Sequence, residues 1–230
     1  MYKKLIFITL LICSKSFSQN FDYKEYGLFL KKYVSESGNV SYDKIKKKEI
    51  DDIAENFLYK TPTNSWSKDD KLAFYINLYN VFTLKSVVDN YPIKSIKDIV
   101  GVWDKDFIAL GKTIYSLGDI ENKILRKMSE PRIHFAVNCA SFSCPKLNNE
   151  PYTSEKLDKQ LDLAAREFIN DKTKNIISEN DLKISSIFNW FGDDFKKQGS
   201  LIEFLNKYSK IKINKKSPVK FLDYNWSLNK

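Results

Sequence analysis

The strongest constraint on the fold of this chain is a long helix predicted for residues 68–90. Ser67 and Asp70 form a capping box at its start, in which the Ser67 hydroxyl accepts an amide N–H that lacks a helical partner. Pro92 stops the helix, because proline has no N–H and its ring clashes with the preceding turn. This is the strongest helix signal in the chain, and it favours a helix-rich fold.

One stripe of this helix carries two amides on an otherwise apolar face. Its members, spaced by three and four residues, are Ala73, Asn77, Asn80, Leu84 and Val88. Buried amides must find hydrogen-bond partners. We expect each asparagine to bond the backbone of a neighbouring loop, and we keep both Asn77 and Asn80 as candidate binding residues.

Shorter elements are predicted along the rest of the chain. Helices are expected at residues 22–35, 43–58, 119–128, 154–170, 186–197 and 200–208. A hairpin is expected from strands at 107–110 and 113–115, a second short hairpin at 175–184, and single strands at 132–139 and 219–228. The pattern indicates a helix-rich α+β single domain with a small antiparallel sheet. Its expected parts are an N-terminal helical extension (19–65), a core (66–170) and a C-terminal part packed on the same domain (171–230).

The first eighteen residues are typical of a signal peptide. Lys3 and Lys4 precede the apolar run 5–12, and a small–x–small pattern ends at Ser18. The run is too short to span a bilayer, which takes about 20 residues, and a lipid-modified Cys13 is the rival interpretation. We therefore expect an exported protein, periplasmic or secreted, cleaved after Ser18, without a later transmembrane segment.

The charge does not indicate a nucleic-acid partner. Cleavage would lower the net charge from +9 to +6, because Lys3, Lys4 and Lys15 would leave with the signal peptide. The other lysines are spread in short runs without interleaved aromatics, as on solvated helix faces. We expect an unidentified ligand or envelope partner, no nucleic acid and no cofactor.

The segment 132–145 holds the only histidine, His134, and both cysteines of the predicted mature chain, Cys139 and Cys144. On a straight strand at 132–139, His134 and Cys139 would lie roughly 16 Å apart. A Cys–His pair needs hydrogen-bond contact. The chain must therefore bend before Cys139, or Cys144 must fold back, for thiol chemistry to involve His134.

Three roles compete for the two cysteines. In an oxidising compartment they can close a disulfide loop that contributes about 2 kcal/mol. Alternatively, either Cys139 or Cys144 is a catalytic nucleophile with His134 as general base. A metal site is excluded, because one histidine and two cysteines in one loop lack a fourth ligand at suitable spacing.

Further side chains are candidates for the same site. Asn138 would share a strand face with His134, Glu121 is a possible carboxylate partner for His134, and Trp103 could line a binding groove. No Gly-x-Ser-x-Gly elbow is present, so a serine hydrolase is not indicated.

Several motifs together resemble the domain of unknown function 547. They are Ala73–Asn80, Ser116–Glu121, Arg132–Ser141 with Cys144-Pro145, and the closing Tyr224–Asn229. Asn122 departs from the histidine expected after Ile-Glu in many relatives. The resemblance also suggests a distant likeness to papain- and transglutaminase-like cysteine hydrolases, although those place cysteine on a helix before the histidine.

Two functions therefore remain open. The first is a binding or assembly module with a polar site around His134, Asn138 and Asn80, stapled by Cys139–Cys144. The alternative is a thiol-dependent hydrolase or acyltransferase that uses His134 with Cys139 or Cys144. A redox protein is less favoured, because the cysteine spacing is wider than Cys-x-x-Cys.

Overall fold

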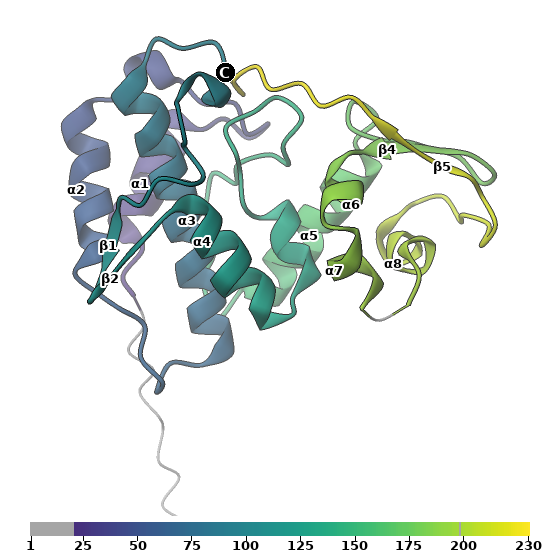
Figure 1. The fold of residues 1–230 in the computed structure, drawn as a ribbon, viewed down its shortest axis with the longest axis horizontal. Helices are drawn as coiled ribbons and strands as arrows, with labels where there is room; N and C mark the ends of the chain where they lie inside the picture. Colours follow the sequence, from purple (N-terminus) through teal and green to yellow (C-terminus); the bar gives the residue numbers. More distant parts are fainter. Residues whose placement is uncertain (1–20, 198) are drawn as a thin grey trace, which may run out of the picture.

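The computed structural model describes residues 21–197 and 199–230 (Figure 1). The predicted signal peptide, residues 1–18, lies outside this part of the chain. Helices dominate the described residues and two small sheets accompany them, which confirms the helix-rich α+β class. No helix in these ranges has both the length and the apolar character needed to cross a bilayer.

Three helices build the N-terminal half. They are α1 (Lys24–Tyr33), α2 (Lys47–Leu58) and α3 (Lys68–Asn90), with a short 3-10 turn, η1 (Tyr42–Lys44), before α2. The bounds of α3 are those predicted, and the Ser67 Oγ accepts the N–H of Asp70 at 3.0 Å. Most of α3 is buried, with α2 packed against it, so α3 is the central element of this half (Figure 1).

A hairpin and an irregular helix follow α3. Their elements are β1 (Ile108–Leu110), β2 (Thr113–Tyr115), α4 (Leu117–Asp119), the π-helical η3 (Ile120–Leu125) and the 3-10 turn η4 (Arg126–Met128). β1 and β2 pair antiparallel, as predicted. The expected helix at 119–128 is thus partly a wide π turn, a feature often found at functional sites.

The C-terminal half contains a helical layer and a three-stranded sheet. Its elements are α5 (Leu157–Asn170), β3 (Ile176–Ile177), β4 (Leu182–Ser185), α6 (Ile187–Trp190), α7 (Gly192–Lys196), α8 (Leu201–Tyr208) and β5 (Val219–Leu222). β3 pairs antiparallel with β4, whereas β5 pairs parallel with β4. The strand predicted for 219–228 therefore ends at Leu222, and only isolated bridges continue it.

The strand predicted for residues 132–139 is wrong. Pro131 begins a 3-10 helix, η5 (Pro131–Phe135), and the Glu130 side chain accepts the N–H of Arg132. Proline is favoured at the first helical position, because its fixed φ suits the turn. The apolar alternation was misleading because residues 133–138 are buried on every side.

Two apolar clusters meet around η5. Ile133 belongs to the cluster around α2 and α3, whereas Phe135 belongs to the cluster around α5 to α8 and stacks on Phe195. Burying a phenylalanine contributes about 2 kcal/mol, so Phe135 helps to hold the two halves together. His134, between these two anchors, is fixed at the junction.

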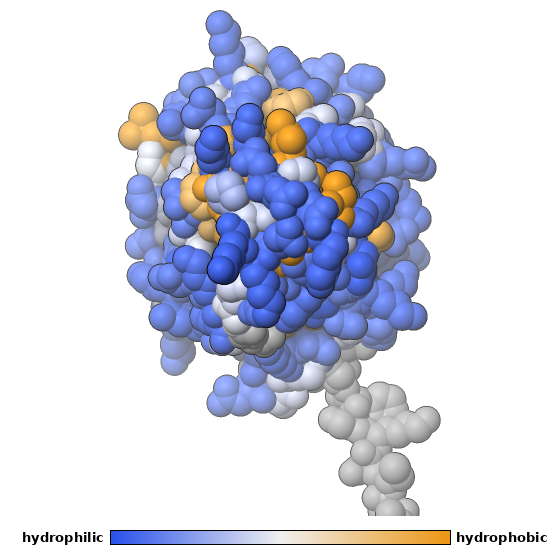
Figure 2. All heavy atoms as spheres, turned by 90° about the vertical axis from the view of Figure 1, so that its right-hand side faces the viewer, coloured by the Kyte–Doolittle hydropathy of each residue, from blue (hydrophilic) through white to orange (hydrophobic). Residues whose placement is uncertain are grey.

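The C-terminal segment crosses from β5 over both halves (Figure 1). Bridges join Ser227 to Ser95 and Leu228 to Ser141. The last anchor is Asn229, whose Oδ1 accepts a hydrogen bond from the Tyr42 hydroxyl at 2.8 Å. The face on the side of α8 and β5 is mostly hydrophilic with scattered apolar side chains (Figure 2). Such a surface agrees with the expectation that the lysines lie on solvated faces.

Candidate functional site

Buried amides fix the loop that carries the cysteines. The Asn80 side chain donates to the Ala136 carbonyl at 3.0 Å and accepts the N–H of Asn138 at 2.8 Å. Asn138 in turn donates to the Pro145 carbonyl and accepts the N–H of Ala140. Ala140 has φ 55°, a left-handed conformation that alanine adopts only when its surroundings impose it. The amides therefore set the position of Cys139.

Asn77 has the same role for another loop. Its side chain donates to the Tyr152 carbonyl at 2.7 Å and accepts the Tyr152 N–H at 3.0 Å. Asn77, Asn80 and Asn138 do not line the cavity described next. These three of the five proposed binding residues instead hydrogen-bond the backbone of neighbouring loops.

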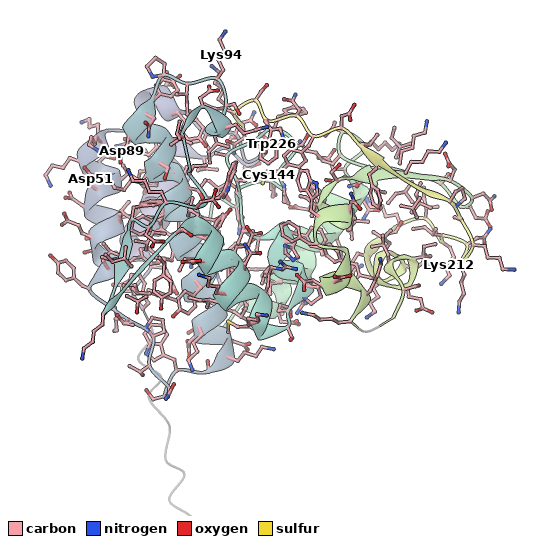
Figure 3. The ribbon with its side chains drawn as sticks, viewed as in Figure 1. Asp51, Asp89, Lys94, Cys144, Lys212 and Trp226 are labelled. Atoms are coloured by element: carbon pink, nitrogen blue, oxygen red, sulfur yellow. The ribbon has the colours of Figure 1, made fainter. Side chains whose placement is uncertain are left out.

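The cysteine loop, η3, η5 and the C-terminal segment enclose a cavity of about 210 Å³. Six aromatic side chains form most of its wall: Tyr79, Trp103, Trp190, Phe191, Tyr224 and Trp226. Trp226 of the C-terminal segment and Cys144 of the cysteine loop both line this cavity, and both are labelled in Figure 3. Glu121, His134 and Cys139 also line this cavity, so the tertiary structure brings three of the predicted reactive groups together.

Trp103 reaches the cavity because its loop packs closely on α4. The Gly118 N–H donates to the Trp103 carbonyl at 2.8 Å, and a Cβ at Gly118 would lie 2.7 Å from that oxygen. The Trp103 indole then contacts Trp226 at a centroid distance of 5.6 Å. Only glycine allows this approach.

His134 is oriented by Asp194. Its Nε2 lies 3.0 Å from Asp194 Oδ2, and since a carboxylate only accepts, Nε2 carries the proton. The other nitrogen, Nδ1, has no hydrogen-bond partner and lies 3.8 Å from Glu121 Oε1. Burial lowers the pKa of His134, although Asp194 opposes this shift. The neutral imidazole therefore presents an available base toward Glu121.

Glu121 is a largely buried carboxyl on the π turn η3, with 12% of its side chain exposed. Burial raises its pKa to about 7, with a further increase from the negative charge of Cys139. A carboxyl that titrates near neutral pH can both donate and accept a proton under physiological conditions. Glu121 is therefore the best-suited general acid–base group in the cavity.

We predict that Glu121→Gln stabilises the protein above pH 7. The native carboxyl keeps its proton to a higher pH than the unfolded one, so stability falls as pH rises from 4.5 through 7. Glutamine removes this loss, and the free energy of unfolding should exceed that of the unmodified protein by about 3 kcal/mol at pH 8. Urea unfolding at pH 8 and at pH 4 measures this difference in the free energy of unfolding, and Glu36→Gln at an exposed glutamate is the control. If the difference in unfolding free energy between Glu121→Gln and the unmodified protein were as large at pH 4 as at pH 8, the raised pKa of Glu121 would be contradicted.

The Cys139 side chain lies in a hydrogen-bond network, in which Cys139 Sγ donates to Cys144 Sγ and Cys144 Sγ donates to the Val137 carbonyl. Its Sγ lies 3.1 Å from Ser141 Oγ, 3.2 Å from the Tyr224 hydroxyl and 2.9 Å from Cys144 Sγ. Ser141 donates to the Tyr224 oxygen, which leaves the Tyr224 proton for Cys139. Burial raises the pKa of Cys139, but its hydrogen bonds with Cys144, Ser141 and Tyr224 outweigh this effect and lower the pKa to about 7. Cys139 is thus an activated thiol.

Cys144 has the opposite character. It is buried, its Sγ accepts the N–H of Cys139 at 2.9 Å, and burial raises its pKa well above the ordinary value. Both cysteines are free thiols in this structure, with their sulfur atoms side by side. The Cys139–Cys144 disulfide stays a prediction.

Residues 63–169 match the family model described as "Protein of unknown function, DUF547". These residues are a DUF547 domain. No curated protein and no solved structure matches the chain. The DUF547 domain supplies Glu121, His134 and Cys139, whereas Asp194 and Tyr224, which orient them, lie beyond its C-terminal end.

Sequence reasoning missed the residues that lie outside the DUF547 domain. They are Trp190, Phe191, Asp194, Tyr224 and Trp226. Tyr224 and Trp226 carried a signal, because they belong to the closing motif 224–229 that supports the family resemblance. Asp194 carried no such signal, since an acidic pair in the first turn of a short helix is usually solvated.

Asn122 stands where a histidine is expected in many relatives. Its side chain donates to the Gly118 carbonyl and accepts from Arg126.

Proposed function

We propose that this protein is a thiol-dependent acyl-transfer enzyme, a hydrolase or acyltransferase, with Cys139 as nucleophile. The observation that carries the proposal is that Cys139, Glu121 and His134 all line one aromatic-walled cavity. Titratable groups with shifted pKa values that converge in an apolar pocket are typical of active sites.

The geometry assigns a role to each group. The Cys139 thiolate attacks a substrate carbonyl, forming a C–S bond, and the bond to the leaving group breaks as Glu121 donates its proton to that group. Glu121, now ionised, next takes a proton from water or an acceptor alcohol or amine, which attacks the thioester and frees Cys139. His134, held by Asp194, is a neutral dipole and base 3.8 Å from Glu121.

Mass spectrometry of the intact protein tests this proposal. Incubation with an activated thioester or p-nitrophenyl ester should add one acyl group, which peptide mapping should place on Cys139. Acylation elsewhere, or none in fully reduced protein, would overturn the proposal.

We predict that the alkylation of Cys139 by iodoacetamide rises with pH around a midpoint near 7. The physical reason is the lowered pKa of Cys139, because only the thiolate reacts. Tyr224→Phe removes one donor, so the midpoint should move upward, whereas the exposed Tyr59→Phe should leave it unchanged. A midpoint at 9 or above in the unmodified protein would argue against an activated thiol.

A binding module stapled by a disulfide is the second candidate. The 2.9 Å between the sulfur atoms of Cys139 and Cys144 favours it, because an oxidant would join them with little movement. Alkylation without and then with reduction separates the two functions. If exported protein reacts only after reduction, the binding module is favoured.

Export is part of this proposal and is supported by the pattern of residues 1–18. The intact mass of protein recovered from outside the cytoplasm should correspond to a chain that begins at Gln19. A chain that kept residues 1–18 would contradict it.

A further inference from the structure

The walls of the cavity indicate what the thiol acts on. Apart from Glu121, His134 and the two cysteines, its lining is aromatic or aliphatic, and none of the described lining residues is a lysine or arginine. Arg126 stacks on the outer wall residue Phe191 but is paired with Asp194. The described lining of the cavity therefore offers no permanent positive charge to an anionic group.

The size of the cavity limits the group that fits. The cavity has a volume of about 210 Å³. This is less than the volume of a typical site for a whole ligand. The cavity suits one part of a substrate, such as a short aliphatic chain or a phenyl group.

Trp190 on α6 is the most exposed wall residue, with 47% of its surface accessible. It packs against Tyr224 at 4.8 Å and stacks on Trp226 at 5.8 Å, so these three rings form one continuous apolar wall. Tyr224 also contacts Cys139. The wall thus runs from the exposed rim to the nucleophile.

We propose that this cavity binds an uncharged apolar acyl group, a short aliphatic chain or a phenyl group, with Trp190 on its rim as a specificity-determining residue. The inference rests on the proposed function, because it places the acyl carbonyl at Cys139. Burial raises the pKa of Glu121 and lowers the pKa of His134, so at these two positions the cavity disfavours charge.

Protection of Cys139 from iodoacetamide tests the proposal in the full reduced chain. Octanamide should slow alkylation about tenfold at a concentration where acetamide, octanoate and tetramethylammonium have little effect. Trp190→Ala should abolish most of this protection, whereas Phe221→Ala, a change at a similarly exposed aromatic on β5, should keep it. Equal protection by acetamide, or stronger protection by octanoate or tetramethylammonium, would overturn the proposal.

Two further readouts separate this inference from the proposed function. Tryptophan fluorescence follows octanamide binding without any reaction of the thiol. If octanamide neither changed the fluorescence nor protected Cys139 from alkylation, the acyl site would be rejected. If octanamide bound but octanoyl thioester formed no octanoyl-enzyme, the proposed enzymatic function would be rejected and the apolar binding site would be kept. Equal turnover of acetyl and octanoyl thioesters would keep the enzyme but reject the acyl preference.

Discussion

Cys139→Ala should prevent formation of the acyl-enzyme and lower turnover of an activated thioester by at least about 10³-fold. Cys139 is the nucleophile in the proposed reaction, and no other described group in the cavity has both a nucleophilic atom and a hydrogen-bond network that lowers its pKa. Stopped-flow release of the leaving group, with intact mass spectrometry of the same samples, measures both effects.

Cys144→Ala is the matched control for this prediction. It removes the neighbouring thiol and one hydrogen bond to Cys139, so the alkylation midpoint of Cys139 should rise while an acyl-enzyme still forms. The reverse pattern, in which Cys144→Ala abolishes acylation and Cys139→Ala does not, would transfer the nucleophilic role to Cys144.

Asp194→Asn should destabilise the protein by about 3 kcal/mol at pH 7. Asp194 is buried and pairs with His134, with Arg126 at 2.5 Å and with Lys197 at 2.9 Å. The change leaves the Arg126 charge without its buried counterion, and it weakens the bond that orients His134. Urea unfolding measures the loss, and Asp193→Asn, an exposed neighbour on α7, should change stability by less than about 0.5 kcal/mol.

The effect of Asp194→Asn should also depend on pH in one direction. Burial opposes ionisation, but hydrogen bonds from His134, Arg126 and Lys197 hold the pKa of Asp194 well below its ordinary value near 3.8. The ionised carboxylate therefore stabilises the fold above pH 3.8, and this contribution disappears as pH falls through the lower native value. A difference between the two proteins that grew below pH 3.8 would contradict the ion-pair assignment.

Local signals in the sequence predicted the helical framework correctly. The Ser67 cap and Pro92 bound α3 as expected, because capping and proline exclusion act within a few residues. The two asparagines of α3 bond loop backbone, as burial of an amide requires. These rules need no knowledge of distant parts of the chain.

The segment around His134 shows where such rules fail. Alternating apolar residues predicted a strand at 132–139, yet the segment is a 3-10 turn with apolar neighbours on all sides. A period of two identifies a strand only when one face meets solvent. The bend that brings His134 and Cys139 to one cavity follows from packing between the two halves.

The sequence by itself determined the helical framework, the membership of residues 63–169 in the DUF547 family and the identities of the only histidine and of two cysteines near it. Only the tertiary structure decided that Glu121 is largely buried, that Asp194 orients His134 and that the Tyr224 hydroxyl contacts Cys139. Asp194 and Tyr224 lie 60 and 85 residues from their partners. Contacts over such distances depend on how the whole chain packs, and so do the pKa shifts that make the site reactive.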